Sequence, residues 1–317
     1  MERKERRASI LLTLAAVIWG LAFVAQRVGS QYVGSFTFTG VRFALGALSL
    51  LPLIYMRNRK EQMETPMKEQ TESITEQSTS KEQANIQLLR IGVIAGILLF
   101  AAASLQQFGL IETTAGKGAF ITGFYIILVP LFGVFLKHKL GLKALIASLL
   151  ALVGLYFISV NGETGISKGD LLIFLSSFFF AFHILLINKY SQTLDTLKLS
   201  FVQYSLCSII SLIAALLFEG IILSGILEAA IPILYGGIFS VGIAYTLQVA
   251  GQKYARASHA SIIMSLEAVF AVVGGALILG ESMEIRGYIG CILMILAVLV
   301  SQYQGRFSIS LAVSNKL

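Results

Sequence analysis

The chain has 317 residues, of which 56% are hydrophobic and only 13% are charged, and its mean hydropathy is +0.81. A water-soluble protein of this length has too small an interior to hide so much apolar surface, so the composition favours a lipid bilayer as its surroundings. The net charge of +7 does not indicate nucleic-acid binding, because the basic residues are scattered at the ends of apolar segments.

Hydropathy predicts ten membrane-spanning helices, each about 20 mostly apolar residues long. The runs are too long and too evenly apolar for the strands of a membrane barrel. The basic N-terminus resembles a signal peptide, but no convincing cleavage site follows it, so we interpret the first run as a membrane helix. The predicted spans are 8–26, 36–56, 88–108, 117–136, 141–160, 169–188, 198–218, 231–251, 259–279 and 285–303.

The spans form two groups of five that resemble each other weakly. Matching residues are 161 positions apart in the first two spans of each group and 142 apart in later spans; the pairs that define these spacings are Trp19 with Phe180, Arg42 with Gln203, Gln106 with Gln248, and Gly133 with Gly275. A repeat with an odd number of spans must place its second copy upside down in the membrane, which is typical of transporters. We therefore predict a first repeat at 1–160, a second at 161–305 and a tail at 306–317.

Positive charges predict the orientation of the chain. Lys and Arg cluster at 3–7, 57–60 and 137–143, in segments predicted to lie on one side of the membrane. By the positive-inside rule, both termini lie in the cytoplasm, and we expect a multi-pass protein of the cell membrane. The segments on the other side contain only four Lys or Arg residues, namely Arg27, Lys117, Lys168 and Arg286.

The segment 57–87 interrupts this pattern between the second and third spans. It is polar and rich in Glu, Gln, Ser and Thr, so it cannot bury enough apolar surface to order itself. We predict a flexible cytoplasmic linker. A regulatory docking segment is the alternative, although no motif supports it.

Three stretches carry a resemblance to a known family. The first span contains IWGLAFVAQRV, the second contains FTGVRFALGALSLLP, and the ninth contains SLEAVFAVVGGALILGE. With ten spans in two halves, the chain resembles EamA-type members of the drug/metabolite transporter superfamily over nearly its whole length outside 57–87. The resemblance implies export or exchange of small metabolites across the cytoplasmic membrane, through a central cavity formed mainly by spans 1, 3, 4, 6, 8 and 9.

Ionisable groups inside the spans are functional candidates, because a charge near the centre of a membrane helix costs roughly 2.5–3.5 kcal/mol. Glu267 in span 9 is the candidate for coupling transport to a proton gradient or for binding a cationic group; a carboxylate fixed between helices is the alternative. Arg42 in span 2 is a structural or anion-attracting candidate. We favour the structural role, since the resemblance implies that span 2 is peripheral. His183 in span 6 is a weaker candidate, with hydrogen-bonded packing as its alternative.

Polar and aromatic side chains gather at matching places in the two halves. Amides, phenols and aromatic faces are suited to a pocket for a small amphipathic solute near the middle of the membrane. Each residue alone is equally suited to bonding between helices. The predicted substrate-binding residues are Trp19, Phe23, Gln26, Gln106, Thr122, Tyr125, His183, Tyr245, Gln248 and Glu267.

Together these features predict an all-α secondary transporter that moves an amino acid, amine or drug-like solute by alternating access, with proton coupling as one candidate mechanism. No phosphate-binding Gly-Lys-Ser/Thr loop occurs, and Cys207 and Cys291 lack metal-ligand spacing, so we expect no enzyme activity, cofactor or metal. The expected partners are a small solute and the bilayer, without nucleic acid, and a homodimer is an open option. The alternatives are a lipid-linked-sugar flippase of the same superfamily, a membrane enzyme and a passive scaffold.

Overall fold

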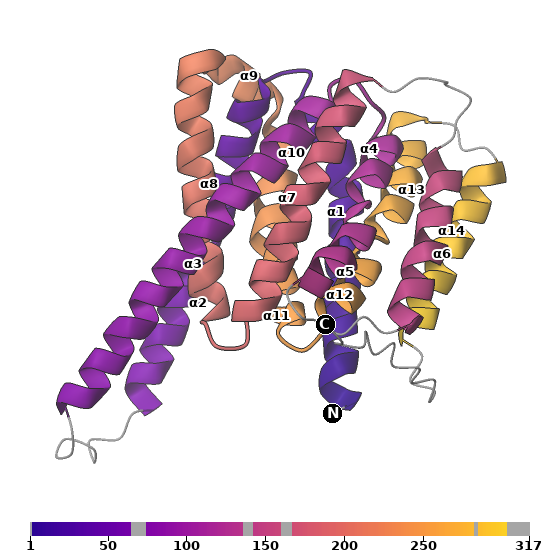
Figure 1. Ribbon diagram of the computed structural model, residues 1–317. Coiled ribbons are helices and arrows are strands. Elements are labelled where there is room, and N and C mark those ends of the chain that lie inside the picture. The colour runs from indigo at the N-terminus through magenta and orange to yellow at the C-terminus, as the bar shows by residue number, and fades with distance from the viewer. Residues whose placement is uncertain (1, 65–73, 136–141, 160–166, 282–284, 303–317) are drawn as a thin grey trace.

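The computed structural model describes residues 2–64, 74–135, 142–159, 167–281 and 285–302, and all regular structure in these ranges is helical. Figure 1 shows most of these helices running up or down one bundle. In chain order they are α1 (Glu2–Gly29), α2 (Ser35–Glu64), α3 (Ile74–Gly109), α4 (Ala115–Thr122), α5 (Tyr125–Phe135), α6 (Leu142–Ser159), α7 (Lys168–Tyr190), α8 (Thr196–Phe218), α9 (Leu223–Glu228), α10 (Ala230–Leu234), the π-helix η1 (Tyr235–Tyr245), α11 (Thr246–Gln252), α12 (Ala257–Met264), α13 (Glu267–Leu279) and α14 (Ile285–Gln302).

Eight segments of the described chain are long and apolar enough to cross a membrane. They match eight of the predicted spans to within six residues at either end, which confirms the all-helical membrane architecture. The other two predicted spans, 141–160 and 285–303, coincide with the shorter apolar helices α6 and α14. The total of ten spans therefore remains a prediction.

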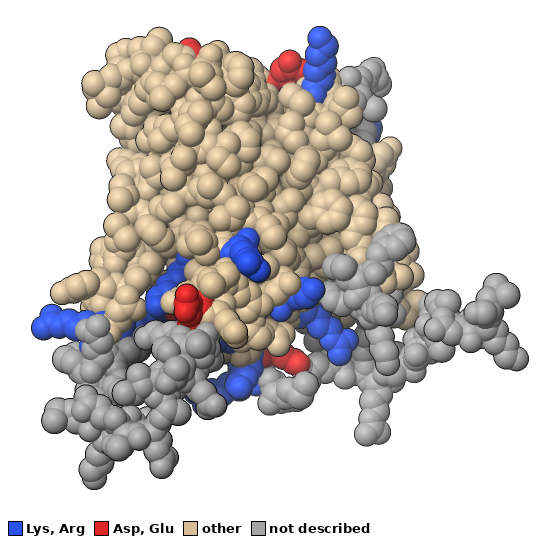
Figure 2. All heavy atoms as spheres, turned by 60° about the vertical axis from the view of Figure 1, so that its left-hand side comes forward, with Lys and Arg blue, Asp and Glu red and all other residues tan. Residues whose placement is uncertain are grey.

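The surface of the bundle is suited to lipid contact. Large apolar side chains point outwards along the helices, and Leu277 and Ile231 are each more than four-fifths exposed. Figure 2 shows a broad band without charged residues, with Lys, Arg, Asp and Glu gathered towards the lower end and at the upper rim. Such an apolar belt would aggregate in water and is stable in hydrocarbon.

The helices pack so that neighbours in space are often distant in sequence. We call the end where α1 begins the proximal end and the end where it finishes the distal end (Figure 1). Helix α3 lies against α7 and α8, while α1 lies against α13 and η1. Helices α6 and α14 pack against each other at one edge.

Helices α2 and α8 pack along each other and are joined at both ends. At the distal end the Glu219 carboxylate, just past α8, accepts hydrogen bonds from the backbone N–H groups of Phe36 (2.7 Å) and Thr37 (2.9 Å) in the first turn of α2. At the proximal end Arg57 of α2 pairs with Asp195, which caps α8. A carboxylate at a helix N-terminus accepts hydrogen bonds from the free N–H groups there and interacts favourably with the positive end of the helix dipole. These contacts fix the middle of α2, which carries Arg42.

The flexible-linker prediction for 57–87 is wrong at both of its ends. Helix α2 continues to Glu64 and α3 starts at Ile74, and both extensions project beyond the bundle in Figure 1. Residues 65–73 lie outside the described residues. The extensions contain Glu, Gln, Lys and Arg, which are good helix formers, and a helix that already exists is extended without the cost of nucleation.

Candidate functional site

Two helices at the centre of the bundle are interrupted at equivalent positions. Helix α4 gives way to α5 at Tyr125, and α12 gives way to α13 at Glu267, 142 residues later. Around both breaks, corresponding backbone N–H groups bond to carbonyls three residues earlier instead of four. Glu267 consequently lies in the first turn of α13, where the helix dipole favours a negative charge.

The side chains at the two breaks meet each other. The Tyr125 hydroxyl donates a hydrogen bond to Glu267 Oε1 at 3.0 Å, and the two residues are only 3% and 4% exposed. This bond joins the two halves of the chain at equivalent positions. It also explains how a carboxylate is tolerated in the bundle, because a buried charge needs a hydrogen-bond donor or a countercharge.

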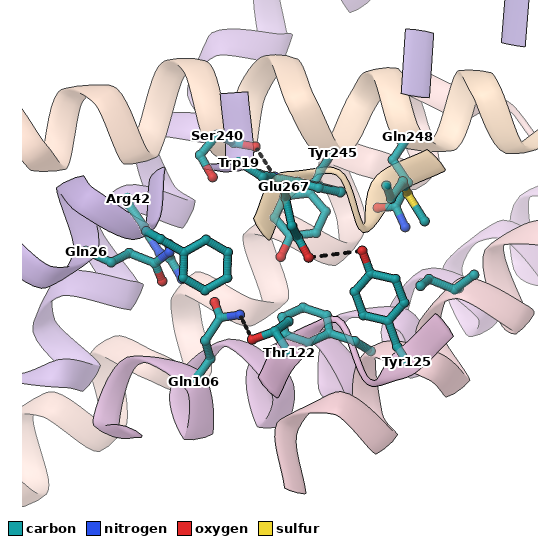
Figure 3. Close-up of a pocket in the computed structure, with 14 residues that line it drawn as sticks. Trp19, Gln26, Arg42, Gln106, Thr122, Tyr125, Ser240, Tyr245, Gln248 and Glu267 are labelled. Atoms are coloured by element: carbon teal, nitrogen blue, oxygen red, sulfur yellow. Dashed lines mark hydrogen bonds between the residues drawn. The ribbon is translucent and has the colours of Figure 1, made fainter. Parts of the chain in front are cut away.

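A cavity opens beside this hydrogen bond and, together with its mouth, holds about 450 Å³ of space free of protein atoms. Figure 3 shows Gln26 and Arg42 on one side of it, Tyr125 and Gln248 on the other, and the Glu267 carboxylate between them. The lining residues are Trp19, Phe23, Gln26, Arg42, Gln106, Thr122, Tyr125, Phe180, Ile184, Ser240, Tyr245, Gln248, Met264 and Glu267.

Most of the lining consists of pairs related by the sequence repeat. The spacings of 161 and 142 residues that relate the two halves connect ten lining residues to one another. The pairs are Trp19 with Phe180, Phe23 with Ile184, Gln106 with Gln248, Thr122 with Met264, and Tyr125 with Glu267. The cavity therefore lies where the two halves face each other.

The π-helix η1 supplies one wall of the cavity and is anchored to α1. Its Ser240 carbonyl accepts a hydrogen bond from Trp19 Nε1 at 3.2 Å, and Trp19 packs edge-on against Tyr245 with ring centroids 4.7 Å apart. On the opposite wall Gln106 Nε2 donates to Thr122 Oγ1 at 3.0 Å. π-Helical turns are rare and often occur at functional sites, so η1 supports the importance of this wall.

The structure places nine of the ten predicted substrate-binding residues around the cavity, and His183 is the exception. His183 is fully buried, with Nε2 2.8 Å from Gln203 Oε1 and its ring edge-on to Tyr245. His183 thus lies in a hydrogen-bonded packing position behind the cavity wall. One helical position further on, Ile184 takes the place on the cavity face.

Four lining residues were not predicted, and the repeat contains the signal for three of them. Adding the spacings to Trp19, Phe23 and Thr122 leads to Phe180, Ile184 and Met264. The fourth, Ser240, has no such signal. Arg42 also lines the cavity, so the expectation that span 2 is peripheral is wrong at this position. Spans 1, 3, 4, 6, 8 and 9 supply the remaining lining residues.

No group of three His, Cys, Asp or Glu side chains within the described ranges is arranged to hold a metal ion. Cys207 is buried and Cys291 is half-buried, and neither is in a disulfide. The aromatic, amide, hydroxyl and charged side chains around the cavity are groups that can contact an organic solute.

Comparison with known proteins agrees with this architecture. The EamA-like transporter family model matches residues 6–160 and again 167–303. An uncharacterized transporter of Archaeoglobus fulgidus is 28% identical over 298 residues, covering 94% of this chain and 86% of the relative. The uncharacterized transporter YoaV of Bacillus subtilis is 20% identical, covering 90% and 94%. A crystal structure with 16% identity has the same fold, with a TM-score of 0.72 over 93% of this chain and 96% of the other. The chain is a multi-pass membrane protein that belongs to the EamA-like transporter family.

Proposed function

We propose that this chain is a secondary transporter that moves a small metabolite, such as an amino acid, amine or drug-like solute, by alternating access. The central cavity is its binding site, between two inverted five-helix halves in the cell membrane. The proximal end, where α1 begins, faces the cytoplasm, and we propose that both termini lie in the cytoplasm. The positive-inside rule supports this orientation, because many described basic residues lie at that end; they include Arg3, Lys4, Arg6, Arg7, Arg57, Arg59, Lys189 and Lys198.

The observation that carries the proposal is the hydrogen bond between Tyr125 and Glu267. It connects the breaks of two discontinuous helices beside a central cavity. Discontinuous helices that meet at the midplane between inverted repeats are a recurring feature of secondary transporters. A solute that binds between the two halves contacts both of them, and can therefore favour one relative position of the halves over the other.

Equivalent hydrogen bonds close the bundle at its two ends and support alternating access. At the distal end, Arg27 of α1 donates through Nη1 to the carbonyls of Leu110 (2.9 Å) and Ile111 (2.5 Å) after α3. At the proximal end, Asn188 of α7 donates through Nδ2 to the carbonyls of Gln252 (3.2 Å) and Ala255 (2.7 Å). We call these sets the distal latch and the proximal latch.

The two latches are related by the same spacings as the cavity residues. Asn188 follows Arg27 by 161 positions, and Gln252 follows Leu110 by 142. Each latch thus joins the end of the first helix of one half to the end of the third helix of the same half. Opening one latch while the other remains closed would expose the cavity to one side of the membrane at a time.

Each latch is connected to a residue that lines the cavity. Arg27 of the distal latch directly follows Gln26 in the chain, and Gln252 of the proximal latch donates through Nε2 to the carbonyl of Ile184 at 3.1 Å. A solute that displaces either lining residue will strain the neighbouring latch. Alternating access requires the solute to bind the outward-open and inward-open states with different free energies, and this connection between cavity and latch is a source of that difference.

The experiment that tests the proposal has two steps. Purified protein is first screened by thermal shift against amino acids, amines and cationic drugs at two pH values, because a ligand that prefers the folded state raises the melting temperature. A stabilising solute is then tested for counterflow in proteoliposomes, with protein-free liposomes as the control. We expect internal unlabelled solute to accelerate uptake of labelled solute. Uptake equal to that of the protein-free liposomes for every stabilising solute would contradict the proposal.

A further inference from the structure

Arg42 lines the cavity as a buried cation that has no charged or hydrogen-bonded partner among the described residues. Its side chain is 2% exposed, and Nε is fully enclosed without an acceptor. The guanidinium lies over the rings of Phe38 and Phe43, with Cζ 5.5 and 5.3 Å from their centroids. Contact with aromatic faces offsets only part of the cost of removing a guanidinium from water. The guanidinium of Arg42 is therefore free to pair with an anion that enters the cavity.

The fold holds Arg42 at this position by several independent contacts. Helix α2 is fixed at its distal end by Glu219 and at its proximal end by Asp195. Gly236 of η1 leaves room for the side chain, because a Cβ at that glycine would lie 3.3 Å from Arg42 Cδ. An arginine placed with this much support is suited to hold a ligand in one geometry.

Other unsatisfied polar groups accompany Arg42 in the cavity lining. Gln26 Oε1 has no hydrogen-bond partner, and the side-chain hydroxyls of Ser240 and Tyr245 make no hydrogen bond with any part of the chain that the structure describes. The two hydroxyls can donate to a bound anion, and so can the Gln26 amide in its other orientation. Arginine is well suited to bind carboxylate with two parallel N–H donors.

These four residues are also the part of the lining that does not follow the repeat. The positions equivalent to Gln26, Arg42, Ser240 and Tyr245 are Ile187, Gln203, Leu98 and Ala103, and none of these lines the cavity. The other ten lining residues form repeat-related pairs. The anion-binding groups therefore break the two-fold relation of the cavity lining, and Figure 3 shows Gln26, Arg42 and Ser240 on one side of Glu267.

The opposite charge lies elsewhere in the same cavity. Glu267 accepts a hydrogen bond from Tyr125, and no cationic side chain in the described ranges lies within 4 Å of its carboxylate. Arg42 and Glu267 line one space without pairing with each other. A cavity with separate positive and negative poles complements a solute that carries both charges.

We propose that Gln26, Arg42, Ser240 and Tyr245 form an anion subsite for the carboxylate of a dipolar solute, whose protonated amine faces Glu267. This inference rests on the proposed function and narrows its solute class to soluble molecules with both groups, such as amino acids. Because Arg42 and Glu267 each occur in one half only, the solute binds in a single orientation.

The test compares three matched probes: an amino acid, the amine that lacks its carboxylate and the acid that lacks its amine. Binding of each probe is measured by calorimetry or thermal shift on the full-length protein in detergent. We expect the wild-type protein to prefer the amino acid over the amine, and Arg42→Gln to reduce this preference by roughly ten- to hundredfold. Tyr245→Phe keeps the ring and should reduce it roughly three- to tenfold. Arg90→Gln, at an exposed position on α3, is the matched control and should leave it unchanged.

The outcomes separate this inference from the proposed function. An unchanged preference in both Arg42→Gln and Tyr245→Phe would overturn the anion subsite, even if the protein transports the amino acid. Absence of binding of all three probes to the wild-type protein would overturn the dipolar solute class, whereas counterflow of another solute would leave the transporter function intact. If Arg42→Gln is not monodisperse in gel filtration, Tyr245→Phe decides, because its packing is preserved.

Discussion

Tyr125 and Glu267 occupy equivalent positions in the two halves of the chain and are joined by a hydrogen bond of 3.0 Å beside the central cavity. The first half supplies a neutral donor and the second half supplies an ionisable acceptor. We propose that protonation of Glu267, or an amine bound to it, changes the contact between the halves. Protonation or a cation at Glu267 would compete with Tyr125 for the carboxylate.

The strength of this contact can be measured with a double-mutant cycle. Tyr125→Phe removes the donor and Glu267→Gln replaces the charged acceptor by a neutral amide oxygen, and both keep the size of the side chain. Because a hydrogen bond to a charged group contributes about 1.5–3 kcal/mol and one between neutral groups about 0.5–1.5 kcal/mol, we expect a coupling of about 1 kcal/mol in the free energy of unfolding in detergent. The control is Tyr235→Phe, which removes a 3.0 Å bond to the Ile18 carbonyl and should be additive with Glu267→Gln. Additive effects of Tyr125→Phe and Glu267→Gln would show that the two side chains do not interact.

Gly20 sets the distance between α1 and α13, and with it the position of Glu267. A Cβ at this residue would lie 2.3 Å from Phe270 Cβ and 2.8 Å from the Glu267 carbonyl oxygen. We expect Gly20→Ala to lower the free energy of unfolding by about 1–3 kcal/mol and to weaken solute binding, because α13 must move. Gly220→Ala is the comparison, since Gly220 has φ +72° and nothing within 4 Å. That variant should lose stability through its backbone and keep its solute affinity; equal losses of affinity in both variants would contradict this account.

The latches should have opposite effects when they are broken one at a time. Arg27→Ala removes the distal latch and Asn188→Ala removes the proximal latch. A cysteine at Met264 in the cavity lining, in a variant without Cys207 and Cys291, reports access by the rate of labelling with an impermeant maleimide. We expect Arg27→Ala to increase labelling from outside the cell, and Asn188→Ala to increase it from the cytoplasmic side, each by about fivefold or more. An increase from the same side in both variants would contradict the assigned roles.

The orientation of the bundle makes a prediction about accessibility in cells. Lys168 at the distal end and Arg256 at the proximal end are both exposed. A cysteine at Lys168 should react with an impermeant maleimide in intact cells, whereas one at Arg256 should react only after the membrane is permeabilised. Labelling of both positions in intact cells would place them in one compartment and refute the inverted arrangement.

The sequence predicted the helical membrane architecture well because an uninterrupted run of about 20 apolar residues is by itself enough to indicate a membrane helix. It could not predict which face of a helix points inwards, since residues facing lipid and residues facing other helices are equally apolar. His183 and Ile184 show this limit: they are adjacent in α7, and only Ile184 lines the cavity. Where the repeat supplies a second constraint, as for Tyr125 and Glu267, both predicted residues lie at the cavity.

Arg42 and η1 mark features that depend on packing between distant segments. In the sequence, Arg42 is one charged residue between Phe38 and Phe43 in an apolar span, which favours a structural role. In the structure its guanidinium lies over both rings, and η1 packs close to it at the cavity. The π-helix at Tyr235–Tyr245 has no local sequence signal that we can identify. Its register follows from close contacts between glycines of α2 and η1, such as Gly46 and Gly237, which are formed only in the folded bundle.

The most direct test of the account is counterflow of a bound solute in proteoliposomes at several pH values, with wild-type protein and Glu267→Gln compared side by side. We predict that wild-type exchange exceeds that of protein-free liposomes and changes with pH, because we propose that the cavity is a transport site in which Glu267 gains and loses a proton. Glu267→Gln should remain folded and lose the pH dependence. Wild-type exchange no faster than in protein-free liposomes would refute transport through this cavity, and an identical pH dependence in Glu267→Gln would remove Glu267 from the coupling step.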